Sequence, residues 1–163
     1  MPLWETVTDL RSDEDVLRRR RYGVIEICDT RLARIHLRPF PKLISLAGAV
    51  WLGRVNHKRL AGDRCWLYYN QPLWHSNFLS VMYIVSARDC QFATLKAAMT
   101  VLEEVARIKG SDAALCDVTG GPISDRLLAR EGWQQHCLDS FGRHYIKRFY
   151  GDYPSPEAAW SLC

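Results

Sequence analysis

The 163-residue sequence lacks any pair of cysteines at the close spacing that zinc sites use. Six cysteines are scattered along the chain without a CxxC motif: Cys28, Cys65, Cys90, Cys116, Cys137 and Cys163. The five histidines show no metal-like spacing either, so the sequence predicts no metal site. Because no secretory signal accompanies the cysteines, we expect reduced thiols, most of them buried as small hydrophobic side chains.

Long apolar runs and a strong charge of either sign are also absent. The longest nearly apolar run, Leu43–Gly53, is too short to span a bilayer, and the first residues, MPLWETVTDLRSDEDV, do not form a signal peptide. We therefore expect a cytoplasmic protein without a membrane partner. The net charge of +4 favours an anionic ligand but is not a nucleic-acid signature. The length predicts a single domain over residues 1–163.

Residues 1–20 are predicted to form a flexible arm that contains a short helix. The segment Ser12–Asp15 is typical of a helix start, and the basic run Arg18–Arg21 follows it, so acids come first and bases last along the helix. The alternative is that this run, with the basic loop at His57–Arg59, binds nucleic acid. The run is short and has no interleaved aromatic residues, so we do not expect a nucleic-acid partner.

Strand-like segments dominate the next part of the chain. Gly23–Cys28 and Leu32–Arg38 alternate or are rich in β-branched residues, and the short turn between them predicts a hairpin. Ser45–Val55 and Arg64–Tyr69 are predicted to form a second antiparallel pair. The strand Phe78–Ser86 follows after a loop.

A long amphipathic helix over Gln91–Lys109 is the strongest local signal. Its apolar residues recur at three- and four-residue steps, and Gly110 is the expected left-handed terminator. With Phe78–Ser86 before it and the strand Ala113–Asp117 after it, the helix predicts a β-α-β unit with parallel strands.

The last third of the chain predicts a short helix followed by a hairpin. The helix covers Ile123–Glu131, and the hairpin pairs Trp133–Cys137 with Arg143–Phe149, which would place His136 beside His144. An exposed C-terminus is expected beyond Pro154. The fold class predicted from all of these segments is α/β (α+β), a mixed, mostly antiparallel sheet with a central β-α-β unit.

This order of elements resembles the GNAT superfamily of acyl-CoA-dependent N-acyltransferases. The resemblance covers roughly Gly23–Phe149, and the segment Arg126–Trp133 (RLLAREGW) is similar in shape to the end of the family's second helix. It implies a GNAT-like sheet and transfer of an acetyl or other acyl group from acyl-CoA to a small-molecule or protein amine. The family binds the cofactor pyrophosphate with a loop of the form Arg/Gln-x-x-Gly-x-Gly/Ala at the start of the long helix.

The sequence departs from the family at the cofactor loop and at the catalytic positions. In one register the two glycine positions fall on Ala93 and Leu95, and in the other, Arg88–Ala93 (RDCQFA), the first falls on Gln91. Side chains there obstruct the close approach of a pyrophosphate to backbone N–H groups. The usual catalytic tyrosine position falls on Leu128, and the central strand carries no glutamate. These departures favour an alternative, a non-catalytic binding module that has lost the cofactor and catalytic motifs.

The resemblance implies a cofactor site around the start of the long helix. Its candidate residues are Val85, Ala87, Arg88, Gln91, Ala93 and Thr94. Arg88 would supply charge and the helix N-terminus backbone donors. The competing interpretation is an ordinary helix start with Asp89 as the N-cap.

Four further residues are candidates for catalysis and substrate binding. Asp117, at the end of a parallel strand, would act as general base or instead hydrogen-bond the Gly120-Gly121 loop. Tyr145 would donate a proton to the leaving thiolate or instead serve as a packing residue. His75 and Trp51 are the candidates for contact with the substrate.

Overall fold

The chain folds around one mixed sheet in the computed structural model, which describes residues 4–41, 61–118, 123–136 and 142–163. The eight strands of this part of the chain are β1 (Glu5–Val7), β2 (Tyr22–Cys28), β3 (Arg31–Arg38), β4 (Arg64–Asn70), β5 (Phe78–Ser86), β6 (Ala113–Val118), β7 (Gln134–His136) and β8 (Arg143–Arg148). Their order across the sheet is β1-β3-β2-β4-β5-β6-β8-β7. Every neighbouring pair is antiparallel except β5 and β6, which are parallel. The predicted fold class is therefore confirmed.

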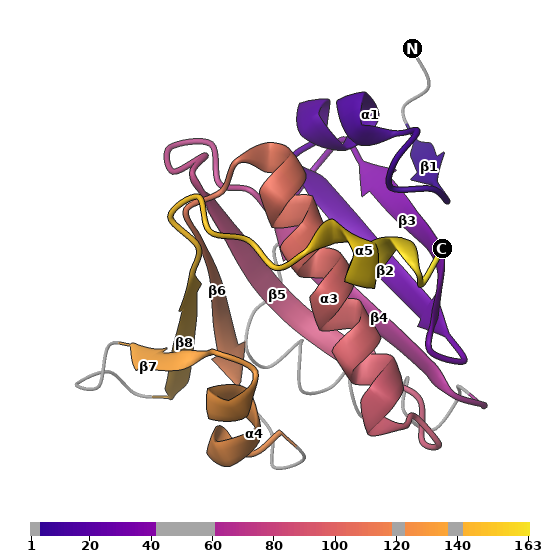
Figure 1. The fold of residues 1–163 in the computed structure, drawn as a ribbon, viewed down its shortest axis with the longest axis vertical. Coiled ribbons are helices and arrows are strands. Elements are labelled where there is room, and N and C mark those ends of the chain that lie inside the picture. Colours follow the sequence, from indigo (N-terminus) through magenta and orange to yellow (C-terminus); the bar gives the residue numbers. More distant parts are fainter. Residues whose placement is uncertain (1–3, 42–60, 119–122, 137–141) are drawn as a thin grey trace.

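Four helices accompany the sheet in the described residues: α1 (Glu14–Arg19), α3 (Phe92–Lys109), α4 (Asp125–Arg130) and α5 (Pro156–Trp160). The long helix α3 crosses one face of the sheet, with α1 and α5 packed beside it (Figure 1). It ends at Gly110, whose φ of 65° is the left-handed conformation predicted for its terminator. Because β5, α3 and β6 follow one another, the predicted β-α-β unit is confirmed as well.

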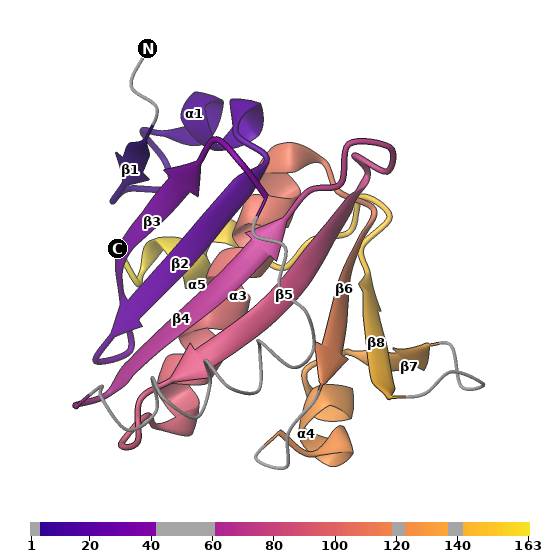
Figure 2. The same ribbon diagram turned by 180° about the vertical axis from the view of Figure 1, so that it is seen from behind.

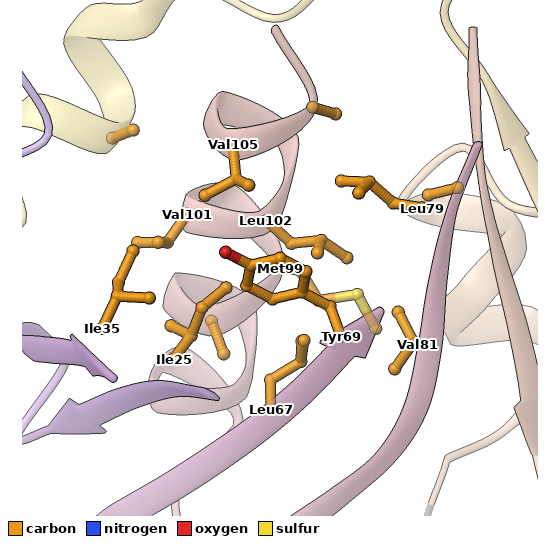
Figure 3. Close-up of a cluster of buried hydrophobic side chains, with 14 of the residues drawn as sticks. Ile25, Ile35, Leu67, Tyr69, Leu79, Val81, Met99, Val101, Leu102 and Val105 are labelled. Atoms are coloured by element: carbon orange, nitrogen blue, oxygen red, sulfur yellow. The ribbon is translucent and has the colours of Figure 1, made fainter. Parts of the chain in front are cut away.

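The hydrophobic core lies between α3 and the sheet (Figure 3). Alternating strand residues such as Ile25, Leu67 and Leu79 point toward Leu102 and Val105 of the helix, and all of these are essentially inaccessible to solvent. The helix contributes these residues from one stripe, as its three- and four-residue periodicity predicts. This packing fixes the position of the two ends of α3 relative to β4, β5 and β6.

The N-terminal segment is part of the fold, which corrects the prediction of a flexible arm over residues 1–20. Strand β1 pairs with β3, and Val7, Leu10 and Leu17 are almost fully buried. The acids of α1 lie in its first turn and its bases in its last, as predicted. Arg18 donates to the carbonyl of Ile108 at 3.0 Å, and Arg20 pairs with Glu5 at 2.6 Å, so part of the basic run is bound to the protein itself.

Two more predictions differ from the structure. The residues beyond Pro154 include α5, in which Ala159 is buried. After this helix, the Leu162 carbonyl accepts a hydrogen bond from the Leu32 N–H at 2.9 Å, which attaches the segment to β3. Most residues of this segment are exposed, as expected, but the segment forms a helix and is attached to the fold. The neighbours of β4 in the sheet are β2 and β5, and its predicted partner, Ser45–Val55, lies entirely outside the described residues.

Candidate functional site

The parallel strands β5 and β6 separate at their carboxyl ends. Their ladder runs from Phe78↔Ala113 to Val81↔Cys116 and stops there, although β5 continues to Ser86 and β6 to Val118. Figure 2 shows the two strands diverging toward α4 and the start of α3. The parallel ladder therefore ends before the last part of β5, at the end of the sheet where open α/β proteins bind ligands.

A bulge interrupts β5 where its ladder with β6 stops. Tyr68 pairs with Tyr83 and Tyr69 pairs with Val81, so Met82 is the extra residue on β5. A bulge bends a strand, strengthens its twist and re-aims the groups beside it. It thus accounts for the divergence of β5 from β6.

The start of α3 is capped by a carboxylate from a distant part of the chain. Gln91 is the N-cap residue and provides no side-chain cap, and no acid occurs in the first turn. Asp63 fills this role instead: its Oδ1 accepts from the Gln91 N–H at 2.8 Å and its Oδ2 from the Thr94 hydroxyl at 2.6 Å. An anion is therefore already bound at the positive end of the helix, and the predicted capping role of Asp89 is wrong.

The six predicted cofactor residues divide between the surface and the interior. Arg88, Gln91 and Ala93 are exposed, whereas Val85, Ala87 and Thr94 are buried. The Ala87 N–H donates to the Arg64 carbonyl at 2.9 Å, and the Thr94 hydroxyl is bound to Asp63. Only the exposed three therefore lie where a ligand can touch their side chains.

Replacing Asp63 with alanine should destabilise the protein by about 2 kcal/mol, because α3 loses its cap and a buried Thr94 hydroxyl loses its acceptor. Asp63→Asn should cost less, since asparagine is also a good capping residue. Thermal unfolding followed by circular dichroism would measure both variants. Equal stability of the wild type and Asp63→Ala would show that the carboxylate does not cap the helix.

Asp117 lies at the separated ends of β5 and β6 and is paired with a histidine. Oδ1 of Asp117 is 2.5 Å from Nδ1 of His144, which lies directly opposite on β8. Since a carboxylate only accepts, Nδ1 donates and Nε2 is left as the second nitrogen of the ring. On β7, His136 lies opposite His144, as predicted. The predicted bond from Asp117 to the Gly120-Gly121 loop concerns residues outside the described part of the chain.

Tyr145 lies on the other face of the sheet from Asp117. Cys116 pairs with Tyr145 and Asp117 with His144, so alternation sends the two predicted catalytic side chains to opposite faces. Tyr145 is only 2% exposed and donates its hydroxyl proton to Asp125. Burial and this hydrogen bond raise the pKa of Tyr145, which makes it a weaker acid. Asp117 and Tyr145 therefore do not form one catalytic pair, and Tyr145 is a packing residue, the alternative given by the sequence.

The two predicted substrate residues do not join this site. His75 precedes β5, at the amino end of a strand that is about 30 Å long, whereas the start of α3 follows its carboxyl end. His75 is exposed and contacts Phe78 edge to face, with ring centroids 6.4 Å apart. His75 therefore lies far from the carboxyl ends of β5 and β6, and its contact with a substrate stays a prediction. Trp51 lies outside the described residues.

Leu128, at the position of the family's catalytic tyrosine, is 1% exposed and belongs to the core. Across the described ranges, no group of three or more His, Cys, Asp or Glu side chains could hold a metal ion. None of the helices in this part of the chain has the length and apolarity to cross a membrane.

The sequence analysis did not identify Asp63 as part of this site, and it did not identify the partnership of His144 with Asp117. One feature of α3 pointed to a distant cap. Its first turn contains no acidic residue and its N-cap side chain accepts no capping hydrogen bond, so a capping carboxylate had to come from another part of the chain. His144 was paired with His136 in the prediction, but its partnership with Asp117 follows only from the register of β6 against β8.

No protein-family model matches the sequence, and no curated protein matches it significantly. Among solved structures, the chain is similar to a nourseothricin acetyltransferase. The two share 12% identity with a TM-score of 0.42, over 90% of this chain and 99% of that chain. We therefore base the functional conclusion on the geometry of this chain.

Proposed function

We propose that this chain is an acyltransferase that binds an acyl-CoA at the carboxyl ends of β5 and β6 and transfers the acyl group to an amine. The observation that carries the proposal is the end of the parallel ladder at Val81 and Cys116. Beyond it, we propose that backbone N–H groups on the β6 side of β5 bind the thioester carbonyl. Such donors, held in place by a sheet, stabilise an oxyanion without needing to reorganise.

The amine also needs a base, and the described residues offer one at this end of the sheet. Asp117 binds Nδ1 of His144 and orients the ring, and we propose that Nε2 takes a proton from the attacking amine. Gly142 lies beside that nitrogen, where a Cβ would come within 3.2 Å of Nε2. The glycine thus keeps the space next to the base free of a side chain. Asp117 would be the positioning residue, in place of the general base predicted from the sequence.

The phosphates of the ligand have less favourable surroundings than its thioester. Asp63 already accepts from the Gln91 N–H at the start of α3, and its charge repels a pyrophosphate. Arg88 is the exposed cation of the turn before the helix. We therefore propose that the phosphates lie on the Arg88 side of the turn, away from Asp63, with affinity reduced by this carboxylate.

A second candidate is a binding module without catalysis, and Asp63 favours it. A carboxylate that caps α3 supplies internally the negative charge that a bound phosphate would otherwise bring. The buried Leu128 and the Tyr145 hydroxyl, already bound to Asp125, point the same way. The two candidates differ in whether the site turns over an acyl thioester.

Acetyl-CoA binding to the wild type and three single variants tests the first candidate. Asp63→Asn should tighten binding about fivefold and Arg88→Ala should weaken it about fivefold, because each changes one unit of charge near the phosphates at roughly 1 kcal/mol. Arg148→Ala is the matched control and should have no effect. Arg148 is an exposed arginine on β8, opposite Ala113 at the amino end of β6 and therefore at the other end of the sheet from the site. Isothermal titration calorimetry measures all four proteins.

Turnover separates the two candidates. Release of free CoA thiol from acetyl-CoA in the presence of a panel of amines should be detectable for the wild type and fall at least tenfold in His144→Gln. Binding without thiol release would support the non-catalytic module. Absence of binding at millimolar acetyl-CoA, in the wild type and in Asp63→Asn alike, would overturn the acyl-CoA proposal.

A further inference from the structure

Two cysteines lie on adjoining segments, Cys65 near the start of β4 and Cys90 at the end of the turn before α3. Cys65 on β4 is opposite Ser86, the last residue of β5. The chain then turns back: the Ala87 N–H donates to the Arg64 carbonyl at 2.9 Å, and the Cys90 N–H donates to the Ala87 carbonyl at 3.1 Å. The Asp63 bond to Gln91, 2.8 Å long, fastens the same two segments. Cys90 consequently packs against the buried cluster that contains Cys65.

The two thiols differ in access and in acidity. Cys65 is fully buried, whereas Cys90 is half-buried and reaches the surface. Interaction with Cys65 lowers the pKa of Cys90, and interaction with Cys90, together with burial, raises the pKa of Cys65. Asp63, the carboxylate that caps α3, opposes the lowering of the Cys90 pKa because its charge repels a thiolate there. The accessible sulfur is therefore the more nucleophilic one.

We propose that Cys65 and Cys90 form a peroxide-reactive thiol pair that closes to an intramolecular disulfide. The Cys90 thiolate attacks one oxygen of hydrogen peroxide, the O–O bond breaks, and Cys90 becomes a sulfenic acid while hydroxide leaves. The Cys65 thiol then attacks the Cys90 sulfur, its proton goes to the departing hydroxyl group, and water is released. Two electrons pass from the two sulfurs to the peroxide, which is the only oxidant required.

Local structure permits the closing step. The sulfur atoms must approach to the disulfide bond length of about 2.0 Å. Residues 87–90 form a turn without regular helix or strand, so the Cys90 backbone can move toward β4 without breaking a ladder. Cys65 needs no access to solvent, because its target is the adjacent sulfur.

Non-reducing peptide mapping tests the proposal on the full reduced chain. Trypsin cleaves after Arg64, Arg88 and Lys96, which places the two cysteines in adjacent peptides, 65–88 and 89–96. After treatment with one to a few equivalents of hydrogen peroxide and alkylation of the remaining thiols, these peptides should appear linked, with a loss of two hydrogens. The wild type carries the primary readout, so no variant has to fold for the test to work.

Three variants identify the steps. Cys65→Ser should abolish the linked peptide and leave a sulfenic acid at Cys90 that dimedone traps, and Cys90→Ser should abolish both products. Cys28→Ser is the matched control, because Cys28 is also half-buried but its thiol is hydrogen-bonded to Asp29 at 3.5 Å, and it should leave the linked peptide unchanged. Sulfinic acid at Cys90 without a linked peptide, or faster oxidation of Cys28 than of Cys90, would overturn the proposal.

Discussion

Replacing Gly23 with alanine should lower the free energy of unfolding by about 3 kcal/mol, because the added methyl group would overpack the core. A Cβ at this position would lie 2.6 Å from Cε1, Cζ and the hydroxyl oxygen of Tyr69. Tyr69 is directly opposite Gly23 on β4 and fully buried at the centre of the core (Figure 3). Its ring covers the glycine and has no path to solvent. The melting temperature should fall by about 8 °C.

Two double variants test whether the Tyr69 ring causes this loss. Tyr69→Phe removes the hydroxyl oxygen but keeps Cε1 and Cζ, so Gly23→Ala should cost nearly as much in that background as in the wild type. Tyr69→Leu removes those atoms, so the same substitution should cost about 2 kcal/mol less there, a coupling that a double-mutant cycle measures directly. Equal costs in all three backgrounds would show that the clash with the ring is not the cause.

The parts of the fold that could be predicted are those with local signals. The helix α3 has a continuous apolar stripe and a glycine terminator, and the hairpins β2–β3 and β7–β8 each pair two strand-like segments that are close together in the sequence. The N-terminal segment has no such signal. Its buried residues Val7, Leu10 and Leu17 lie in a strand, a turn and a helix, so no single period connects them, and only tertiary packing reveals that they are anchored.

The arrangement of the site depends on the register between strands and on contacts between residues far apart in the chain. Neither can be read from a single sequence. The cap of α3 comes from Asp63, separated from Gln91 by 28 positions along the chain. The opposite faces taken by Asp117 and Tyr145 follow from the pairing of Asp117 with His144, and a shift by one residue would have placed the two on one face. The position of His75, by contrast, was deducible: a loop before a nine-residue strand cannot adjoin the turn that follows the same strand.

Replacing Arg107 with methionine should destabilise the protein by about 3 kcal/mol, because a buried carboxylate loses its cation. The Glu104 side chain is 1% exposed, and Arg107 binds both of its oxygens at 2.8 Å. The Trp160 indole N–H also donates to Glu104, at 3.1 Å, and Arg107 reaches Glu14 of α1 at 2.8 Å. One guanidinium and one carboxylate thus connect α1, α3 and α5. These hydrogen bonds to Glu104 and Glu14 raise the pKa of Arg107, so it stays charged throughout the accessible pH range.

The cost should depend on the charge left behind, and two variants separate that effect from lost packing. In Arg107→Met/Glu104→Met the carboxylate is gone as well, and we expect at least about half of the stability to return, since apolar replacements of a buried ion pair are often neutral. Lys96→Met is the surface control: Lys96 pairs with Glu131 at 3.8 Å with its side chain 55% exposed, and its loss should cost less than about 0.5 kcal/mol. Urea unfolding at neutral pH measures all three. If the double variant is no more stable than Arg107→Met, the loss comes from the arginine stem and its contact with Glu14. A recovery would instead show that the carboxylate of Glu104 is stable in the interior only because Arg107 neutralises it.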